Sequence, residues 1–180
     1  MPWSDPAVSV IMIFRDAGRF IAEAIHSVEA QTFTDWELVL VDDGSTDDGP
    51  AIVAQHQRRL GARLRLLRHP GGGGRGTGPS RNLGMQAARG RYLAFLDADD
   101  VYEPRRLEQH VQCLERDPDL GVVMSPERYW RSWQSADKHV ASEGDRIIGP
   151  AVTSGRRIEP PALIVATLLT RGAPIPAPCS

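Results

Sequence analysis

Four short apolar runs recur along the first hundred residues, and a segment with a helical spacing of apolar positions follows each of them. The runs cover residues 8–14, 36–41, 64–67 and 92–96. Their nearly unbroken apolar character is typical of strands that are buried on both faces. A fifth short strand is predicted at residues 122–124.

Helices are predicted between these strands. In the first, Phe20, Ile21, Ala24, Ile25 and Val28 fall on one side, and Asp16 is expected to cap the helix. Ser45 and Asp48 resemble a capping box for the second helix. The later helices are predicted over residues 48–60, 79–88, 104–115 and 160–170. The alternation predicts an α/β fold, a mostly parallel sheet with helices on both faces.

Ligands bind at the carboxyl ends of the strands in sheets of this kind. Three of the four predicted strand ends carry acids, at Arg15-Asp16, at Asp42-Asp43 and at residues 97–100, and the remaining end carries a glycine-rich loop. One acid could stand there by chance, but the coincidence of several favours a site at this edge of the sheet.

The sequence Asp97-Ala98-Asp99-Asp100 places three carboxylates together directly after an apolar run. Acids held this close repel one another, and burying them unpaired is costly. A divalent cation, Mg²⁺ or Mn²⁺, would balance them and would also hold phosphate oxygens. The first hypothesis is therefore a metal-assisted site for a phosphorylated substrate. The alternative is a solvated acidic turn, because Asp is common in turns.

The stretch 42–47 lies at the second strand-to-helix turn. The Asp43 carboxylate can accept a hydrogen bond from a nucleobase N–H or a ribose hydroxyl. A turn followed by a helix cap, supported by Ser45 and Thr46, is the simpler alternative. A binding role is favoured for Asp43 because Asp97 and Asp99 are expected at a nearby strand end.

The glycine loop at residues 71–78 contains the G-x-G-x-x-G pattern at Gly71, Gly73 and Gly76, and Asp97 lies about 20 residues further on, as in a dinucleotide fingerprint. The loop follows the third strand rather than the first, however, and it lacks the Gly-Lys-Ser/Thr ending of a phosphate-binding loop. A flexible surface loop is the favoured interpretation. A nucleotide-dependent oxidoreductase that uses this loop is kept as the alternative.

Ser80-Arg81-Asn82 opens the next helix, whose N-terminus attracts anions. Arg81 can add a guanidinium to a diphosphate, or it can be a solvated residue beside an ordinary cap. The five histidines show no metal-ligand spacing and are given no role. Trp130 and Trp133 are interpreted as core residues, with a platform for a sugar ring as the alternative.

The 180-residue chain is 41% hydrophobic, with a net charge of −2 and no basic run, so a nucleic-acid partner is not expected. Two distant cysteines form neither a disulfide framework nor a zinc pattern and favour a reducing compartment. No signal peptide is recognisable, and the apolar run at 162–169 is far shorter than the about 20 residues that span a bilayer. The expected location is the cytoplasm, including the inner face of the membrane. The chain is expected to be a fragment truncated at its C-terminus.

Several stretches, taken in order over residues 7–124, resemble the family 2 glycosyltransferases. They are residues 8–11, 31–33, 37–47, 81–84, 90–92 and 95–100, with Pro104 behind. The resemblance implies the Rossmann-like GT-A fold, with a nucleotide-sugar-binding part over about 7–125 and the start of an acceptor-side part over about 126–180 of one incomplete domain. It also implies sugar transfer from a nucleotide diphosphate, with inversion at the anomeric carbon.

The resemblance further implies roles for individual residues. Asp43 would hold the donor base, Asp97 and Asp99 would form the D-x-D pair, and Asp99 would contact the Mn²⁺ or Mg²⁺ that bridges the diphosphate. Asp97 would lie near the ribose and is a second candidate metal ligand. The expected nucleotide-sugar-binding residues are Ile13, Arg15, Asp43, Arg81, Asn82, Asp97, Ala98 and Asp99.

Two departures from the family pattern bear on function. Ile13-Phe14-Arg15-Asp16 stand where the family has Pro or Thr followed by Tyr-Asn, so a base-stacking Tyr is absent. The family's general base is expected beyond Ser180, so weak or no activity is predicted for the chain alone. The favoured donor is a UDP-sugar, and the acceptor is a carbohydrate or a lipid-linked sugar in cell-wall or polysaccharide synthesis. A non-catalytic nucleotide-sugar-binding module remains an alternative.

Overall fold

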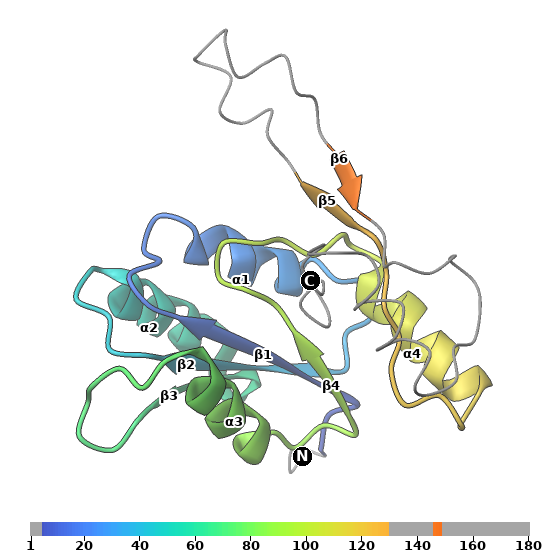
Figure 1. The fold of residues 1–180 in the computed structure, drawn as a ribbon, viewed down its shortest axis with the longest axis horizontal. Helices are drawn as coiled ribbons and strands as arrows, with labels where there is room; N and C mark the ends of the chain where they lie inside the picture. The colour runs from blue at the N-terminus through green and yellow to red at the C-terminus, as the bar shows by residue number, and fades with distance from the viewer. Residues whose placement is uncertain (1–4, 130–145, 149–180) are drawn as a thin grey trace, which may run out of the picture. The chain divides into compact units, whose positions relative to one another are not determined.

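The computed structural model describes residues 5–129 and 146–148, and these belong to two compact units that divide after Asp117. The first unit contains a four-stranded parallel sheet in the order β3–β2–β1–β4 (Figure 1). Its strands are β1 (Val8–Phe14), β2 (Trp36–Asp42), β3 (Leu64–Arg68) and β4 (Tyr92–Phe95). The four strands predicted from the apolar runs are thus confirmed to within one residue at each end.

The helices alternate with the strands as predicted. They are α1 (Ile21–Glu29), α2 (Gly49–Leu60), α3 (Thr77–Ala87) and α4 (Arg106–Arg116), and a 3₁₀ turn, η1 (Gly61–Arg63), leads into β3. Because every strand of the first unit is parallel to its neighbours, α1, α2 and α3 each return the chain from the carboxyl edge of the sheet to the amino edge. The α/β class is confirmed.

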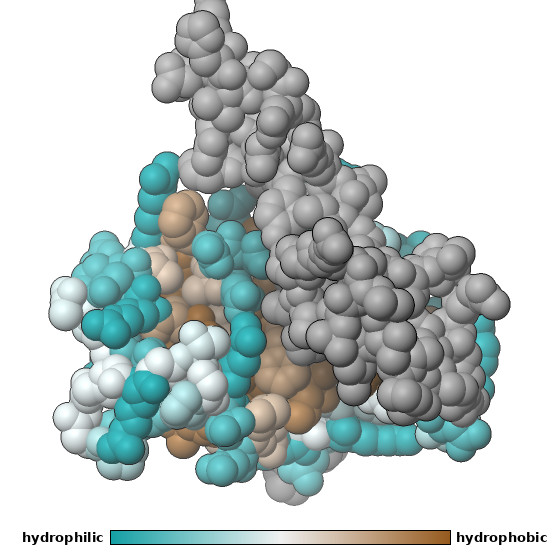
Figure 2. All heavy atoms as spheres, in the orientation of Figure 1, coloured by the Kyte–Doolittle hydropathy of each residue, from teal (hydrophilic) through white to brown (hydrophobic). Residues whose placement is uncertain are grey.

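The two faces of the sheet are covered by different helices. Alternate side chains of β1, from Val8 to Phe14, join the hydrophobic core with apolar side chains of α1, α2 and α4. On the opposite face α3 packs close to the sheet, where Gly84 lies against Ile11 and Val41. In Figure 2, apolar residues are visible in the region where Figure 1, in the same orientation, shows the sheet, and hydrophilic residues lie on either side. Helices on both faces of the sheet are therefore confirmed.

The second unit is described over a smaller part. Its strands β5 (Glu127–Tyr129) and β6 (Arg146–Ile148) pair antiparallel. The predicted strand at 122–124 is wrong: these residues form no regular structure, and Val122 is 61% exposed. Three apolar residues without a partner strand bury too little surface to be held as a strand. The predicted helix at 160–170, Trp130 and Trp133 lie outside the described residues.

Both predicted helix caps are wrong. The residues that precede α1 and α2 are Phe20 and Asp48, and neither makes a side-chain capping bond. Asp16 instead accepts the N–H of Thr46 at 2.7 Å, and Ser45 Oγ accepts the N–H of Asp16 at 3.1 Å. These side chains join the loops after β1 and β2 to each other, because their oxygens find backbone N–H groups across the strand ends.

A buried polar network fixes the turn that leads into β4. Glu37 is fully buried, and its Oε1 accepts the hydroxyl of Ser9 at 2.6 Å and the N–H of Arg89 at 2.8 Å. The N–H of Gly90 donates to Ser9 Oγ at 2.8 Å, and the guanidinium of Arg65 lies 3.4 Å from Glu37 Oε2. The network holds the turn between α3 and β4 against β1 and β2, and so sets where β4 begins.

Replacing Glu37 with leucine is expected to destabilise the fold by about 3–5 kcal/mol, because it leaves the half-buried Arg65 guanidinium without its counter-charge and the Ser9 hydroxyl and Arg89 N–H without their acceptor. Urea unfolding followed by circular dichroism measures the loss. Ser9→Ala removes one neutral donor and is the milder control, at about 1 kcal/mol. A Glu37→Leu variant as stable as the natural chain would show that the network does not support the fold.

Candidate nucleotide-binding site

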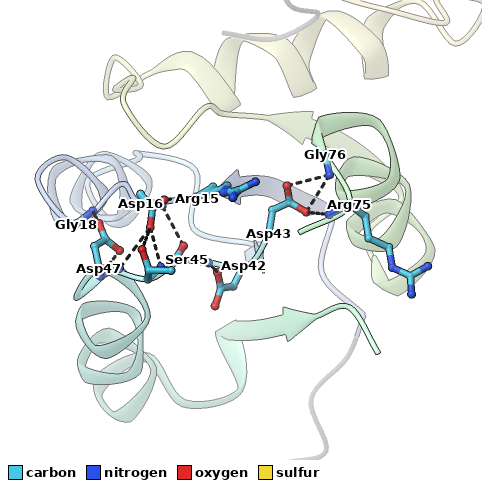
Figure 3. Close-up of polar contacts among 11 residues, drawn as sticks. Arg15, Asp16, Gly18, Asp42, Asp43, Ser45, Asp47, Arg75 and Gly76 are labelled. Carbon is cyan, nitrogen blue, oxygen red and sulfur yellow. Dashed lines mark hydrogen bonds and ion pairs between the residues drawn. The ribbon is translucent and has the colours of Figure 1, made fainter. Parts of the chain in front are cut away.

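Asp43 follows β2 at the carboxyl edge of the sheet and is held by the end of the glycine loop (Figure 3). Its Oδ1 accepts the N–H of Arg75 at 2.7 Å and the hydroxyl of Ser80 at 2.8 Å. The N–H of Gly76 donates to Oδ1 at 3.2 Å and to Oδ2 at 3.0 Å. Among the described donors Oδ2 therefore takes one bond, and it keeps a lone pair for a ligand.

The Asp43 carboxylate is ionised although it is 7% exposed. Burial by itself raises the pKa of the carboxyl group, but the hydrogen bonds from Arg75, Ser80 and Gly76 outweigh burial and hold the pKa below its ordinary value. A nearly buried anion that keeps a free lone pair is suited to accept an N–H from a heterocyclic base.

His69 lies behind this carboxylate. Its Nε2 is 2.8 Å from Ser80 Oγ and 3.8 Å from Asp43 Oδ1, and all three residues are less than 10% exposed. Because Ser80 gives its proton to Asp43, the His69 Nε2–H donates to Ser80. The hydroxyl stands between imidazole and carboxylate, so this is not the order of a nucleophilic triad, in which the base takes the proton of the hydroxyl. His69 and Ser80 instead orient Asp43.

No role is predicted for His69 from the sequence, and the structure places it against Ser80 and Asp43. His69 and Ser80 lie 11 residues apart, and Ser80 and Asp43 lie 37 apart. No local spacing joins them, and the sheet order alone brings them together.

Consecutive residues at the start of α3 join the ends of β2 and β4. Ser80 donates to Asp43, and the next residue, Arg81, donates from Nη2 to Asp97 Oδ1 at 2.8 Å. In the sheet β2 and β4 are separated by β1, so one helix turn spans the carboxyl end of the central strand. The structure thus brings Asp43, Arg81 and Asp97 to one side of the molecule, as the sequence predicted.

The acidic stretch forms a turn in which the N–H of Asp100 donates to the carbonyl of Asp97 at 3.1 Å. Ala98 is buried, whereas Asp99 is exposed, and over the described residues no donor contacts the Asp99 carboxylate. Tyr102 closes the base of the turn, because its hydroxyl donates to the carbonyl of Phe95 at 2.6 Å. Asp99 is therefore an accessible carboxylate on a fixed turn.

The repulsion expected among these acids is relieved by Arg81 at Asp97 and by solvent at Asp99. Over residues 5–129 and 146–148, one group of three possible metal-ligand side chains has its ligand atoms within 4.8 Å of one another. This group is His26, Glu29 and His56, and the acidic turn is not part of it. A cation at Asp97 and Asp99 would therefore take further ligands from a bound diphosphate. His26 and His56 come from different helices, so spacing along the sequence does not reveal this group.

The other predicted residues lie around the same edge. Ile13 is half-buried in β1, and Asn82 is exposed on α3 beside Arg81. Arg15 is exposed, with Nη1 only 3.1 Å from the point where a Cβ on Gly74 would lie. Arg15 therefore borders the glycine loop, and it stands where the family pattern has a tyrosine.

The glycine loop packs backbone to backbone on the turn after β2. A Cβ on Gly44 would lie 2.6 Å from the nitrogen of Gly74, and one on Gly74 would lie 2.5 Å from the carbonyl oxygen of Asp43. The N–H groups of Arg75 and Gly76 are used by Asp43. They are thus not available to a pyrophosphate, which argues against the dinucleotide interpretation of the loop. The end of the loop is anchored rather than free.

Acid should weaken the fold through Asp43. A carboxyl group whose pKa is lowered in the folded state contributes stability above its unfolded pKa, and the contribution is lost as the pH falls through the folded pKa. The free energy of unfolding, measured with urea, should therefore decrease as the pH is lowered below about 4. Asp43→Asn should flatten this dependence. An identical pH profile in both proteins would show that Asp43 is not held as described.

Comparison with known proteins identifies the relatives of the chain. The family model described as glycosyl transferase family 2 matches residues 9–159. The uncharacterized glycosyltransferase alr2836 of Nostoc sp. is 37% identical over 116 residues, which cover 64% of this chain and 35% of that protein. The chain thus spans about a third of the length of this relative.

Solved structures give the same fold. The S. aureus TarS 1-349 structure in complex with UDP-GlcNAc matches with a TM-score of 0.57 and 26% identity, over 66% of this chain and 37% of that one. The mannosyltransferase PcManGT from Pyrobaculum calidifontis, in complex with GDP-Man and Mn²⁺, matches with a TM-score of 0.58 and 25% identity, over 69% and 37%. The sheet and its helices form a GT-A fold. In the described part of the chain, each helix is too short or too polar to cross a membrane.

Proposed function

Because the chain belongs to glycosyltransferase family 2, we propose that its carboxyl sheet edge binds a nucleotide-diphosphate sugar, whose sugar passes to an acceptor hydroxyl. The observation that carries the proposal is the pair of contacts from α3, Ser80 to Asp43 and Arg81 to Asp97. They hold Asp43 and the acidic turn on either side of the end of β1, which supports the proposal. A nucleoside diphosphate needs this combination, since its base and its phosphates lie at opposite ends.

In the proposed complex the Asp43 Oδ2 accepts an N–H of the base. Both uracil and guanine present such a group, and the solved neighbours contain UDP-GlcNAc or GDP-Man. Arg15 is exposed beside Gly74 and can lay its guanidinium against the face of the base. We favour a UDP-sugar as donor and a carbohydrate or lipid-linked acceptor.

We propose that the phosphates bind at the acidic turn through Mn²⁺ or Mg²⁺. The donor set fits such an ion, because Asp99 offers an accessible hard carboxylate without a protein partner among the described residues and Asp97 stands beside it. When bound, the ion would supply Lewis-acid stabilisation of the negative charge that grows on the leaving diphosphate. Arg81, which is ion-paired with Asp97, would add a second cation, with Asn82 beside it.

The chain's own residues supply orientation rather than acid–base chemistry in this proposal. They hold the donor so that an acceptor hydroxyl approaches from behind the anomeric carbon, which gives inversion. We assign no general base among the described residues.

Calorimetric titration tests the proposed function. UDP or GDP should bind in the presence of MnCl₂, and binding should fall by about tenfold or more when EDTA replaces the metal. NAD should not bind. Metal-independent binding of NAD, with no binding of UDP or GDP, would overturn the proposal and favour the oxidoreductase interpretation of the glycine loop.

A further inference from the structure

A second cluster of ligand side chains lies at the C-terminal ends of α1 and α2. His26 and Glu29 stand in the last turn of α1, and His56 stands in the last turns of α2. One nitrogen or oxygen of each lies within 4.8 Å of the others, and His56 Nδ1 is 3.5 Å from Glu29 Oε1. Since both helices return to the amino edge of the sheet, this cluster lies at the opposite edge from Asp43 and Asp97.

Two members of the cluster, Glu29 and His56, already bind the guanidinium of Arg59. Arg59 Nη2 lies 2.6 Å from Glu29 Oε1, 2.9 Å from Glu29 Oε2 and 3.0 Å from His56 Nδ1. A guanidinium can only donate, so in this contact the Nδ1 of His56 is the acceptor, and its lone pair is aimed at Arg59. A metal ion needs a histidine lone pair that is aimed in the same way.

The surroundings also favour a cation. The last turn of a helix carries a partial negative charge from its unpaired carbonyl groups, and two helices end here. His56 and Glu29 are largely buried, whereas the side chain of Arg59 is 55% exposed. Arg59 can therefore leave for solvent at little cost, while the two ligand side chains stay in place.

We propose that His26, Glu29 and His56 form a Zn²⁺ site that staples α1 to α2, and that Arg59 occupies it when the metal is absent. Two imidazoles and one carboxylate are a ligand set typical of zinc with one open position. Ligand atoms of a tetrahedral zinc ion lie about 3.3 Å apart for bonds of about 2.0–2.1 Å. The 3.5 Å between His56 Nδ1 and Glu29 Oε1 already fits, and the exposed His26 side chain would complete the set.

Two consequences follow from this arrangement. Zinc binding should raise the melting temperature of the chain, because the ion binds the folded arrangement of two helices and not the unfolded chain. Arg59 should compete with zinc for Glu29, so removal of its charge should strengthen binding. Neither effect depends on the proposed glycosyltransferase activity.

Titration of the 180-residue chain with ZnCl₂ in a buffer that contains excess Mg²⁺ tests the site, with calorimetry and the melting temperature as readouts. The natural chain should bind one equivalent, His26→Ala should bind at least about tenfold more weakly, and Arg59→Gln should bind more tightly. Because His26 is exposed, its replacement should leave the fold intact, which circular dichroism checks. Asp99→Asn, which alters the acidic turn, should leave zinc binding unchanged.

Co²⁺ gives an independent readout, since its visible absorption reports tetrahedral coordination by nitrogen and oxygen. The site would be supported if this absorption is lost in His26→Ala and becomes more intense in Arg59→Gln. Equal zinc affinity of the natural chain and His26→Ala would overturn the proposal, as would zinc binding that disappears in Asp99→Asn.

Discussion

Asp99→Asn is expected to lower the affinity for UDP in the presence of Mn²⁺ by at least about 10- to 100-fold, while binding measured in EDTA stays the same. Replacing a residue that only hydrogen-bonds to a metal ligand already lowers metal affinity by this factor, and Asp99 is proposed as a direct ligand. The substitution keeps the shape of the side chain and removes its charge. Because the carboxylate contacts no described donor, the fold should not suffer. Calorimetry with and without MnCl₂ gives both affinities.

Asp5→Asn is the matched control for this experiment. Asp5 is exposed and precedes β1 at the amino edge of the sheet, so the variant has the same change in net charge away from the site. Its UDP affinity should equal that of the natural chain. Equal metal-dependent binding in Asp99→Asn and Asp5→Asn would contradict the assignment of the acidic turn.

Gly84→Ala is expected to destabilise the chain by about 1–3 kcal/mol and to weaken UDP binding by about tenfold. The added Cβ would lie 2.5 Å from Ile11 Cγ2 and 3.4 Å from Val41 Cγ2, so α3 must move away from the sheet. Ser80 and Arg81 stand on the same helix and would withdraw from Asp43 and Asp97 together. Urea unfolding and calorimetry measure the two effects.

Gly78→Ala is the control that separates the effect of close packing at Gly84 from the effect of the higher helix propensity of alanine. Gly78 also lies in α3, and no heavy atom stands within 4 Å of the Cβ it would carry. The same substitution there should stabilise the helix by up to about 1 kcal/mol and leave UDP binding intact. If both glycine variants behave alike, close packing of α3 does not position the site.

The sheet was predictable because its strands are buried on both faces. A strand such as β2, in which all seven residues are buried, must be apolar nearly throughout, and this signal survives in a single sequence. Residues 122–124 gave the same local signal without a partner strand, so the prediction failed there. The caps failed because the oxygens of Asp16 and Ser45 bind each other's loop across the strand ends, a contact that sequence spacing does not contain.

The acidic side of the candidate site was predictable for a topological reason. Acids that follow parallel strands must meet at one edge, so Asp43 and Asp97 could be placed together from the alternation of elements alone. His69 and Ser80 could not be placed there, since His69 reaches Asp43 through Ser80 and neither residue type signals such a contact. Arg81 was predicted to contact a diphosphate, and the structure shows it paired with Asp97. The packing of α3 determines which group Arg81 contacts.

The most direct measurement is a crystal structure of the chain with UDP and Mn²⁺, with the anomalous signal of manganese used to locate the ion. We expect the manganese peak beside Asp99, the uracil N–H at Asp43 Oδ2, and the diphosphate within reach of Arg81. A nucleotide bound on the glycine loop away from Asp43, or a manganese peak remote from Asp99, would contradict a single pocket built across the end of β1.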